Sequence, residues 1–502
     1  MSNDPIAKLH NVDSELVLGL VGAVGTDLRR VRDVLEESLK RIGYSVEVVK
    51  ISTDVIPLFR EVEYREQDES DRIEKLMDAG NRAREWASDN GVLALGAASI
   101  IAAHRVNSGK EGLPLPRTAF LIDSLKRPEE VERLRKIYPG GFVLLGIHSE
   151  ESRRIAKLQS RDVPEETARH LIKRDSAENI KSHGQRLERT FYLSDFFIRL
   201  DGNDDLLQSE IRRLVELLFG QPFWTPSFDE YAMFFAFAAA LRSADLSRQV
   251  GAVIARDQQI LSTGANDCPK SGGGLYWPER DDRGILGDAI DGRDYMRGFD
   301  SNRKIQKDMV DKLVSLGKTH GVDEGQLRAL LASKDSPIRD LTEYGRVVHA
   351  EMDALTSCGR AGISTVGATL YCTSFPCHNC AKHIVAAGIA RVVYIEPYEK
   401  SKAADFHQDS IVFGAGGPEN GKVRFEPFIG IGPRRFFDLF SMNLSSGYDV
   451  DRKKKDSETG EKAEWSPETA RLRVQMLPST YLDLELEAVE LFKQKLKPDG
   501  AQ

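Results

Sequence analysis

The sequence predicts an α/β protein with two domains, and three observations support this prediction. The chain has 502 residues, which is too long for one ordinary domain core. Apolar strand-like runs alternate with charged helical stretches over residues 1–220, as expected for a parallel sheet flanked by helices. A second series of helices and strands follows the proline-containing segment QPFWTPS. We therefore expect a first domain over residues 1–222 and a second over residues 223–502.

Composition and charge narrow the classes of function. Hydrophobic residues make up 41% and charged residues 29% of the chain, as in globular proteins. No stretch approaches the roughly 20 apolar residues of a membrane span, and residues 1–15 lack the pattern of a secretory signal. We therefore expect a cytoplasmic protein with no membrane partner. The net charge of -8 gives no general attraction to nucleic acid, which disfavours a polymeric substrate.

The cysteines favour thiol or metal chemistry over disulfides. The chain has five, an odd number in a long sequence without a signal for export. We expect reduced thiols, some of which bind a metal.

The first domain begins with a strand, a glycine-rich turn and a helix. Residues 15–25 read ELVLGLVGAVG, and residues 27–42 then carry apolar side chains at helical spacing. Further strands are expected at residues 44–51, 118–122 and 141–147, and an amphipathic helix at residues 205–219 closes the domain.

The second domain opens with an apolar helix near residue 228 and two strands within residues 249–266. A charged, glycine-rich segment at about 269–341 is expected to be an insertion with some helix. The domain resumes with a helix near His349, a strand at 369–373, a helix from Cys377 and a strand at 391–395. The almost wholly polar residues 452–463 predict an exposed loop within a C-terminal extension.

The strongest chemical signal is HAE at residues 349–351 followed by PCHNC at residues 376–380. His349, Cys377 and Cys380 can bind one zinc ion and leave its fourth position open, which indicates catalysis. Zinc lowers the pKa of a bound water towards about 7, so that hydroxide can attack an amidine-like ring carbon. Glu351 would take the proton from the water, deliver it to the ring nitrogen and help ammonia leave. This paired motif is the signature of zinc nucleobase deaminases.

The alternative is a structural zinc site, which would need a fourth ligand. Cys358, Cys372, His378 and His383 are near enough in sequence to offer one. Cys358 and Cys372 lie within apparently packed elements, so we interpret both as core thiols.

Residues 229–400 resemble the deoxycytidylate deaminase branch of the cytidine deaminase superfamily. The resemblance rests on the zinc motifs and on ALRSADLSRQVGAVI followed by STGAN. It implies a mixed sheet with the zinc site between two helices, and it assigns Asn266 to binding the sugar or base of the substrate. The alternative for Asn266 is a turn residue that caps a strand. Asp267 replaces the glycine usual in this branch.

The segment GLVGAVGTDL resembles the P-loop of nucleoside monophosphate kinases. Backbone amides at Gly22, Gly25 and Thr26 could cradle phosphate. The P-loop lysine is missing, so the domain resembles a degenerate kinase, and we favour nucleotide sensing, regulation or assembly over phosphoryl transfer. A scaffold is the alternative. Arg153, Arg154 and Arg161 would form a phosphate-clamping lid or a solvated helix face.

Together the two halves resemble the bacterial antiphage deoxycytidine triphosphate deaminases. The resemblance implies conversion of dCTP or dCMP to dUTP or dUMP, depletion of the nucleotide pool during infection, a homo-oligomer and a means of holding the enzyme inactive. A housekeeping dCMP deaminase is the nearest alternative. A nucleic-acid editing deaminase is a more distant one, for which 434–435 and 452–455 are the basic clusters.

Overall fold

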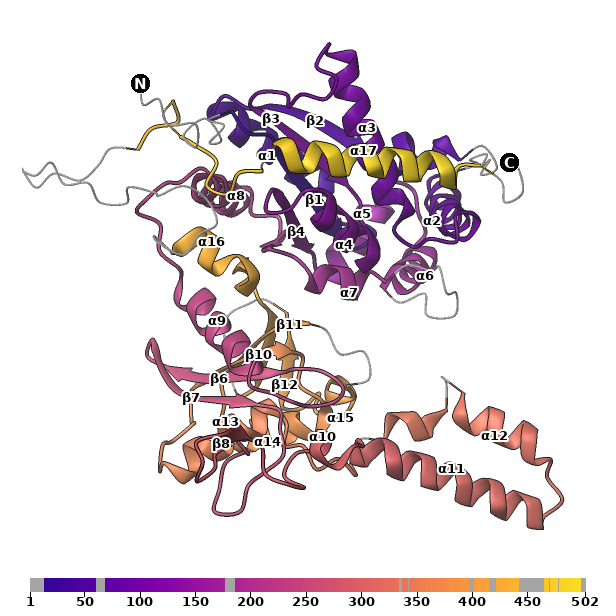
Figure 1. Cartoon of the computed structure of the whole chain (residues 1–502), viewed down its shortest axis with the longest axis vertical. Helices are drawn as coiled ribbons and strands as arrows, with labels where there is room; N and C mark the ends of the chain where they lie inside the picture. The colour runs from indigo at the N-terminus through magenta and orange to yellow at the C-terminus, as the bar shows by residue number, and fades with distance from the viewer. Residues whose placement is uncertain are drawn as a thin grey trace, which may run out of the picture. The chain divides into compact units, whose positions relative to one another are not determined.

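The fold is described from a computed structural model of the chain (Figure 1). It describes residues 13–59, 68–176, 186–333, 336–341, 343–396, 401–414, 421–441, 465–468, 470–476 and 478–497. The polar run 452–463 lies outside these residues. The chain divides into two compact units: unit 1 is Met1–Glu230 with Ile429–Gln502, and unit 2 is Tyr231–Phe428. Within the described ranges, no helix is long and apolar enough to cross a membrane.

Unit 1 is built on a six-stranded sheet in the order β14-β5-β4-β1-β3-β2. The first five strands of the chain are parallel, and β14 runs antiparallel to β5. This arrangement confirms the predicted parallel sheet. The strands are β1 (Leu16–Gly22), β2 (Ser45–Lys50), β3 (Thr118–Asp123), β4 (Phe142–His148), β5 (Phe196–Arg199) and β14 (Gly430–Ile431).

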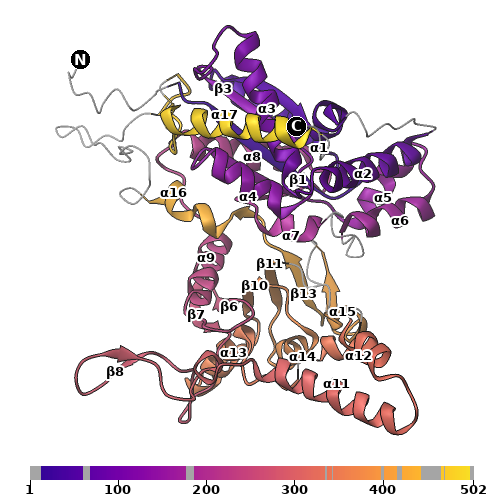
Figure 2. The same ribbon diagram turned by 45° about the vertical axis from the view of Figure 1, so that its right-hand side comes forward.

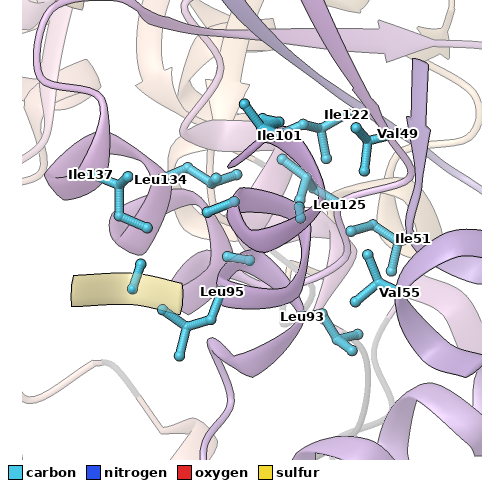
Figure 3. Close-up of a cluster of buried hydrophobic side chains, with 14 of the residues drawn as sticks. Val49, Ile51, Val55, Leu93, Leu95, Ile101, Ile122, Leu125, Leu134 and Ile137 are labelled. Carbon is cyan, nitrogen blue, oxygen red and sulfur yellow. The ribbon is translucent and has the colours of Figure 1, made fainter. Parts of the chain in front are cut away.

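Strand β1 is apolar along its whole length because helices cover both faces of the sheet. Val17 and Val21 face a core shared with α3 (Val92–Asn107), α4 (Pro128–Ile137) and α17 (Pro478–Lys495). The intervening residues of β1 face α1 (Leu28–Arg41) and α8 (Asp204–Leu218). Figure 3 shows the first of these cores, where side chains from β2 and β3 meet those of α3 and α4.

The remaining elements of unit 1 are shorter or lie beside the sheet. Helices α2 (Glu69–Trp86), α5 (Glu151–Gln159) and α6 (Glu165–Ser176) share a small apolar cluster of their own. The others are α7 (Leu187–Tyr192), a π-helical turn η2 (Ile51–Val55), and the short helices η3 (Ile56–Leu58), η5 (Pro433–Arg435) and α16 (Phe436–Phe440).

The C-terminal extension belongs to unit 1, which corrects the division at residues 222 and 223. Helix α17, yellow in Figure 1, lies against α3. Its Glu485 pairs with Arg105 of α3, and Arg105 also pairs with Glu15 before β1. All three charged side chains are buried, so each depends on the others. The first boundary also moves, to Glu230 and Tyr231.

Unit 2 is built on a mixed sheet in the order β12-β13-β11-β10-β6-β7. Strands β10, β11, β13 and β12 are parallel, and the β6–β7 hairpin joins them antiparallel through β10. The strands are β6 (Gly251–Arg256), β7 (Gln259–Ala265), β10 (Thr369–Ser374), β11 (Arg391–Glu396), β12 (Ile411–Phe413) and β13 (Val423–Pro427). The predicted hairpin and the predicted strands at 369–373 and 391–395 are confirmed.

Helices α13 (Ala350–Arg360) and α14 (His378–Ala386) pack on one face of this sheet and share its core. Gly264 of β7 allows α13 to approach closely, because a Cβ atom there would lie 2.2 Å from the carbonyl oxygen of Ala350. Outside the predicted insertion, the other helices are α9 (Phe228–Ala240), which begins at the boundary of the unit, and α15 (Ala403–Phe406).

The predicted insertion contains more regular structure than the sequence indicated. It forms a two-stranded ribbon, β8 (Glu279–Arg280) with β9 (Leu286–Gly287), and a short helix, α10 (Asp294–Arg297). Helices α11 (Ser301–Thr319) and α12 (Glu324–Ala332) then form a hairpin, visible in Figure 1 and Figure 2, and η4 (Pro337–Asp340) leads back to the sheet.

Candidate active site

The three predicted metal ligands come together at the amino ends of two helices. His349 is the N-cap residue of α13, Cys377 is the N-cap residue of α14, and Cys380 follows in the first turn of α14. The Nδ1 atom of His349 lies 3.4 Å from Sγ of Cys377 and 3.3 Å from Sγ of Cys380. One nitrogen and two sulfurs therefore face a common point.

This donor set fits zinc. Tetrahedral zinc bonds of about 2.0 Å to nitrogen and 2.3 Å to sulfur would place the two donor atoms about 3.5 Å apart, close to the observed separations. Among the residues that the structure describes, no fourth histidine, cysteine or carboxylate joins the group. A tetrahedral ion held here would keep one position open, as catalytic zinc does.

The other candidates for a fourth ligand lie elsewhere. Cys358 and Cys372 are fully buried in the apolar core of unit 2, and the thiol of Cys358 donates a hydrogen bond to Oγ of Ser262 at 3.2 Å. The ring of His378 contacts Phe406, with ring centroids 5.8 Å apart. The geometry therefore agrees with the interpretation of both cysteines as core thiols.

The electrostatics of the site favour a thiolate at Cys377. The hydrogen bond from Cys380, and then the one from His349, lower the pKa of Cys377 to about 3. The amino end of α14 also stabilises negative charge at this position. Because a thiolate is the form of cysteine that binds metal, Cys377 is prepared for ligation.

Glu351 lies beside the three donors. It occupies the first turn of α13, two residues after His349, and is 4% exposed. Burial raises the pKa of its carboxyl group. Glu351 lines the same cavity as His349 and Cys377, so a molecule in that cavity can exchange a proton with it.

The cavity has a volume of about 340 Å³, which is within the range of small-molecule sites. Arg248, Arg303 and Arg339 line it and are exposed, which places their guanidinium groups towards its rim. Ser374 also lines it, and the buried hydroxyl of Ser374 has no hydrogen-bond partner in the described part of the chain. None of these four residues was assigned to the site from the sequence: Arg248 lies within the quoted segment ALRSADLSRQVGAVI without a role, and no motif marks the other three.

Asn266 lines this cavity, but its amide group is bound to the backbone. Its Oδ1 atom accepts a hydrogen bond of 2.7 Å from the Val250 amide, and its Nδ2 atom donates one of 2.8 Å to the Arg248 carbonyl. These contacts are those of the alternative role, a residue that fixes a turn. One lone pair and one N–H remain for a substrate, so the two roles are compatible.

The residues proposed for nucleotide binding in unit 1 line a separate cavity of about 240 Å³. Gly22 is the last residue of β1, and Gly25 and Thr26 lie in the loop between β1 and α1, where Gly25 has a φ of 85°. A side chain at Gly25 would also meet the carbonyl oxygen of Arg154 at 2.6 Å. Of the three arginines considered for a lid, Arg161 lines the cavity and Arg153 and Arg154 do not.

Comparisons with known proteins agree with this site. Residues 226–396 match the family model for the cytidine and deoxycytidylate deaminase zinc-binding region. The deoxycytidylate deaminase of Enterobacteria phage T4 is 31% identical over 172 residues, which cover 33% of this chain and 77% of the phage protein. That of Mycobacterium phage D29 is 33% identical over 171 residues, which cover 34% of this chain and 94% of the phage protein.

A solved structure of the dCMP deaminase from cyanophage S-TIM5, in complex with dCMP and dUMP, is 20% identical. It covers 41% of this chain and 99% of that protein, with a TM-score of 0.23. The sequence matches to the family model and to the two phage proteins are sufficient to assign the family. The chain belongs to the cytidine and deoxycytidylate deaminase family. It is a hydrolytic deaminase, and zinc is its cofactor.

Proposed function

We propose that unit 2 deaminates a free deoxycytidine nucleotide, dCTP or dCMP, to dUTP or dUMP and ammonia. The observation that supports this most is the placement of Glu351, His349 and Cys377 in one cavity with three arginines near its rim, where His349 and Cys377 also group with Cys380 as metal donors. The buried end of the cavity provides the chemistry of a base, and the rim provides charges suited to phosphate.

In this proposal His349, Cys377 and Cys380 would hold zinc, and zinc bound there would supply an acidified water for attack on the ring carbon that bears the amino group. Glu351 accepts the proton of the attacking water and delivers it to the adjacent ring nitrogen. It then takes the second proton of that water, from the hydroxyl now on the ring carbon, and passes it to the amino group. The carbon–nitrogen bond breaks as the carbonyl forms, and the amine leaves as ammonia. The carboxyl group ends in its starting state, so one residue serves the whole cycle.

Arg248, Arg303 and Arg339 would bind the phosphates. Arginine suits this role because its planar donors match phosphate oxygens. The acidic residues of the cavity are already engaged: Asp294 pairs with Arg346, Asp300 caps α11, and Asp245 accepts a hydrogen bond from the Ser247 amide. Arg248 itself lies 3.8 Å from the carboxylate of Glu396, so a phosphate would compete with Glu396 for this arginine. Asn266 would hold the segment 248–250 and contact the sugar or base.

For unit 1 we propose nucleotide binding at Gly22, Gly25 and Thr26, with a regulatory role. The cavity at this loop and the absent P-loop lysine support binding without phosphoryl transfer.

We further propose a homo-oligomer that depletes deoxycytidine nucleotides during phage infection. Its support is the fusion of these two units. Phage challenge of cells that carry the active or the Glu351→Ala protein tests the role in defence, and equal phage growth in both would leave housekeeping metabolism.

Ammonia release from dCTP, dCMP, deoxycytidine, CTP and a cytosine-containing oligonucleotide tests the activity. We expect turnover of dCTP or dCMP that disappears in Glu351→Ala. Turnover of the oligonucleotide alone would contradict the proposal and favour the editing alternative. Of the two basic clusters considered for that alternative, the described one is at 434–435. Arg435 is engaged by Asp195 and Asp438 in unit 1, and residues 452–455 lie outside the described part of the chain.

A further inference from the structure

The glycine-rich loop of unit 1 binds a carboxylate side chain of the protein itself, that of Asp175. Asp175, near the end of α6, has a fully buried side chain. Its Oδ2 atom accepts a hydrogen bond of 2.6 Å from the Val24 amide in the loop. Its two carboxylate oxygens also lie 2.9 Å and 3.1 Å from Nζ of Lys126.

Lys126 stands where a phosphate-binding loop needs a cation. The residue follows β3, and its Nζ atom lies 3.0 Å from the carbonyl oxygen of Gly22. The loop sequence places Gly25 and Thr26 where the P-loop pattern has lysine and serine or threonine, so the loop supplies no lysine of its own. Lys126, which lies in the segment after β3 and not in the loop itself, brings an ammonium group to this loop.

We propose that the Asp175 carboxylate occupies the phosphate position of this loop, and that a phosphate group of a nucleotide binds by taking the Val24 amide and Lys126 from it. This inference rests on the proposed nucleotide binding of unit 1 and says how that binding would be controlled, by competition between the Asp175 carboxylate and phosphate. A carboxylate and a phosphate both present paired, negatively charged oxygens to an amide and an ammonium group, so they compete for the same contacts.

The rest of the cavity suits a nucleotide. Thr26 lines it, and the buried Thr26 hydroxyl has no hydrogen-bond partner in the described ranges. Its other wall is apolar and can receive a base, with Ile51, Ile56, Leu76, Met77 and Leu93. Lys157 and Arg161 also line the cavity, paired with Asp27 and Glu69 respectively.

Displacement of the Asp175 side chain would alter the position or the stability of helix α6. A buried carboxylate that loses both partners is strongly destabilised, so it must leave the interior when phosphate arrives. Because Asp175 belongs to the last turn of α6, that helix must shift or loosen. Binding of phosphate at the loop is thereby coupled to a helix, which gives unit 1 a means of regulation.

The test measures binding of inorganic pyrophosphate and of ATP to the zinc-loaded full-length protein by calorimetry. We expect Asp175→Asn to bind pyrophosphate at least tenfold more tightly than the wild type, because the competing charge is gone. Lys126→Met should bind at least tenfold more weakly. Asp78→Asn is the matched control: Asp78 also pairs with α6, through Arg174, but is not among the residues that line the cavity, so its affinity should stay within twofold.

The outcomes separate this inference from the proposal on which it rests. If wild-type protein binds ATP and Asp175→Asn does not bind either probe more tightly, unit 1 binds nucleotide but Asp175 does not compete. If neither protein binds either probe, both ideas fail. Binding of ATP but not pyrophosphate would show that the base contributes most of the affinity, and the tenfold gain should then appear with ATP.

A measurement on the wild-type protein covers the case in which Asp175→Asn does not fold. Hydrogen exchange of the amides of α6 should become faster when ATP or pyrophosphate is bound, because the Asp175 contacts are lost. Unchanged or slower exchange at saturating ligand would overturn the inference.

Discussion

The Nδ1 atom of His349 lies 3.4 Å from Sγ of Cys377, although the two residues are 28 positions apart in the chain. Both residues are N-caps, so the contact depends on two helices that begin side by side on one face of the sheet. The metal site is therefore a product of the helix starts and of the packing beneath them.

The zinc content should follow this geometry. We expect about one zinc per chain in the wild type and a loss of most of it in Cys377→Ala, because two donors hold the ion far less tightly than three. Cys358→Ala, which changes a core thiol of the same unit, should keep its zinc. Metal analysis of the purified proteins checks both, and zinc retained by Cys377→Ala would contradict the assigned ligands.

Arg303 should contribute to substrate binding. We expect Arg303→Ala to lower kcat/KM for dCTP or dCMP by about 10- to 100-fold, the loss typical of one hydrogen bond to a charged group, mainly through KM. Deamination of deoxycytidine, which has no phosphate, should change little. Arg328→Ala is the control, because Arg328 lies on the same hairpin and pairs with Asp311 away from the cavity. Equal effects on nucleotide and nucleoside would show that Arg303 does not bind phosphate.

Gly264 should be needed for the position of α13. A methyl group there would lie 2.2 Å from the Ala350 carbonyl and 2.5 Å from the Ala354 amide, so the helix that begins at His349 must move. We expect Gly264→Ala to destabilise the fold by about 1–3 kcal/mol and to lower zinc retention. In Gly287→Ala the new methyl group meets no atom within 4 Å, so thermal melting should match the wild type. A stable, zinc-loaded Gly264→Ala protein would refute the argument.

Glu210 should make stability depend on pH. Burial raises its pKa to about 7, and its Oε2 atom has no hydrogen-bond partner in the part of the chain described. Because the folded state holds this proton more tightly than the unfolded state does, the stabilisation is complete below about pH 4.5 and is lost as the pH rises through about 7.

Glu210→Gln removes this dependence. At pH 8 we expect the variant to be more stable than the wild type by on the order of 2 kcal/mol, with the difference vanishing near pH 4.5. Chemical denaturation at several pH values measures it. Asp205→Asn, an exposed substitution on the same helix, should not reproduce the trend. A difference that does not change with pH would show that the Glu210 carboxyl titrates normally.

The sequence predicted the elements that local patterns encode. The strand β1 was expected because its run is continuously apolar, as in a buried parallel strand. The strands expected at 369–373 and 391–395 each end one residue later in the structure. The helix starts at His349 and Cys377 were expected because the motif itself has the form of two N-termini. The insertion was harder, because the ribbon β8–β9 is short and exposed and has little apolar patterning.

What the sequence by itself indicated is the chemistry: His349, Glu351, Cys377 and Cys380 are a spaced set whose residue types predict a metal ligand group and a proton carrier. Only the tertiary structure decided which other residues and segments lie around these residues and around the loop of unit 1. Arg303 and Arg339 enter the cavity through a helical insertion, α17 returns to unit 1, and Asp175 fills the loop near Val24. Each of these depends on contacts between residues far apart in the chain, and such contacts are set by packing and charge pairing rather than by any local pattern.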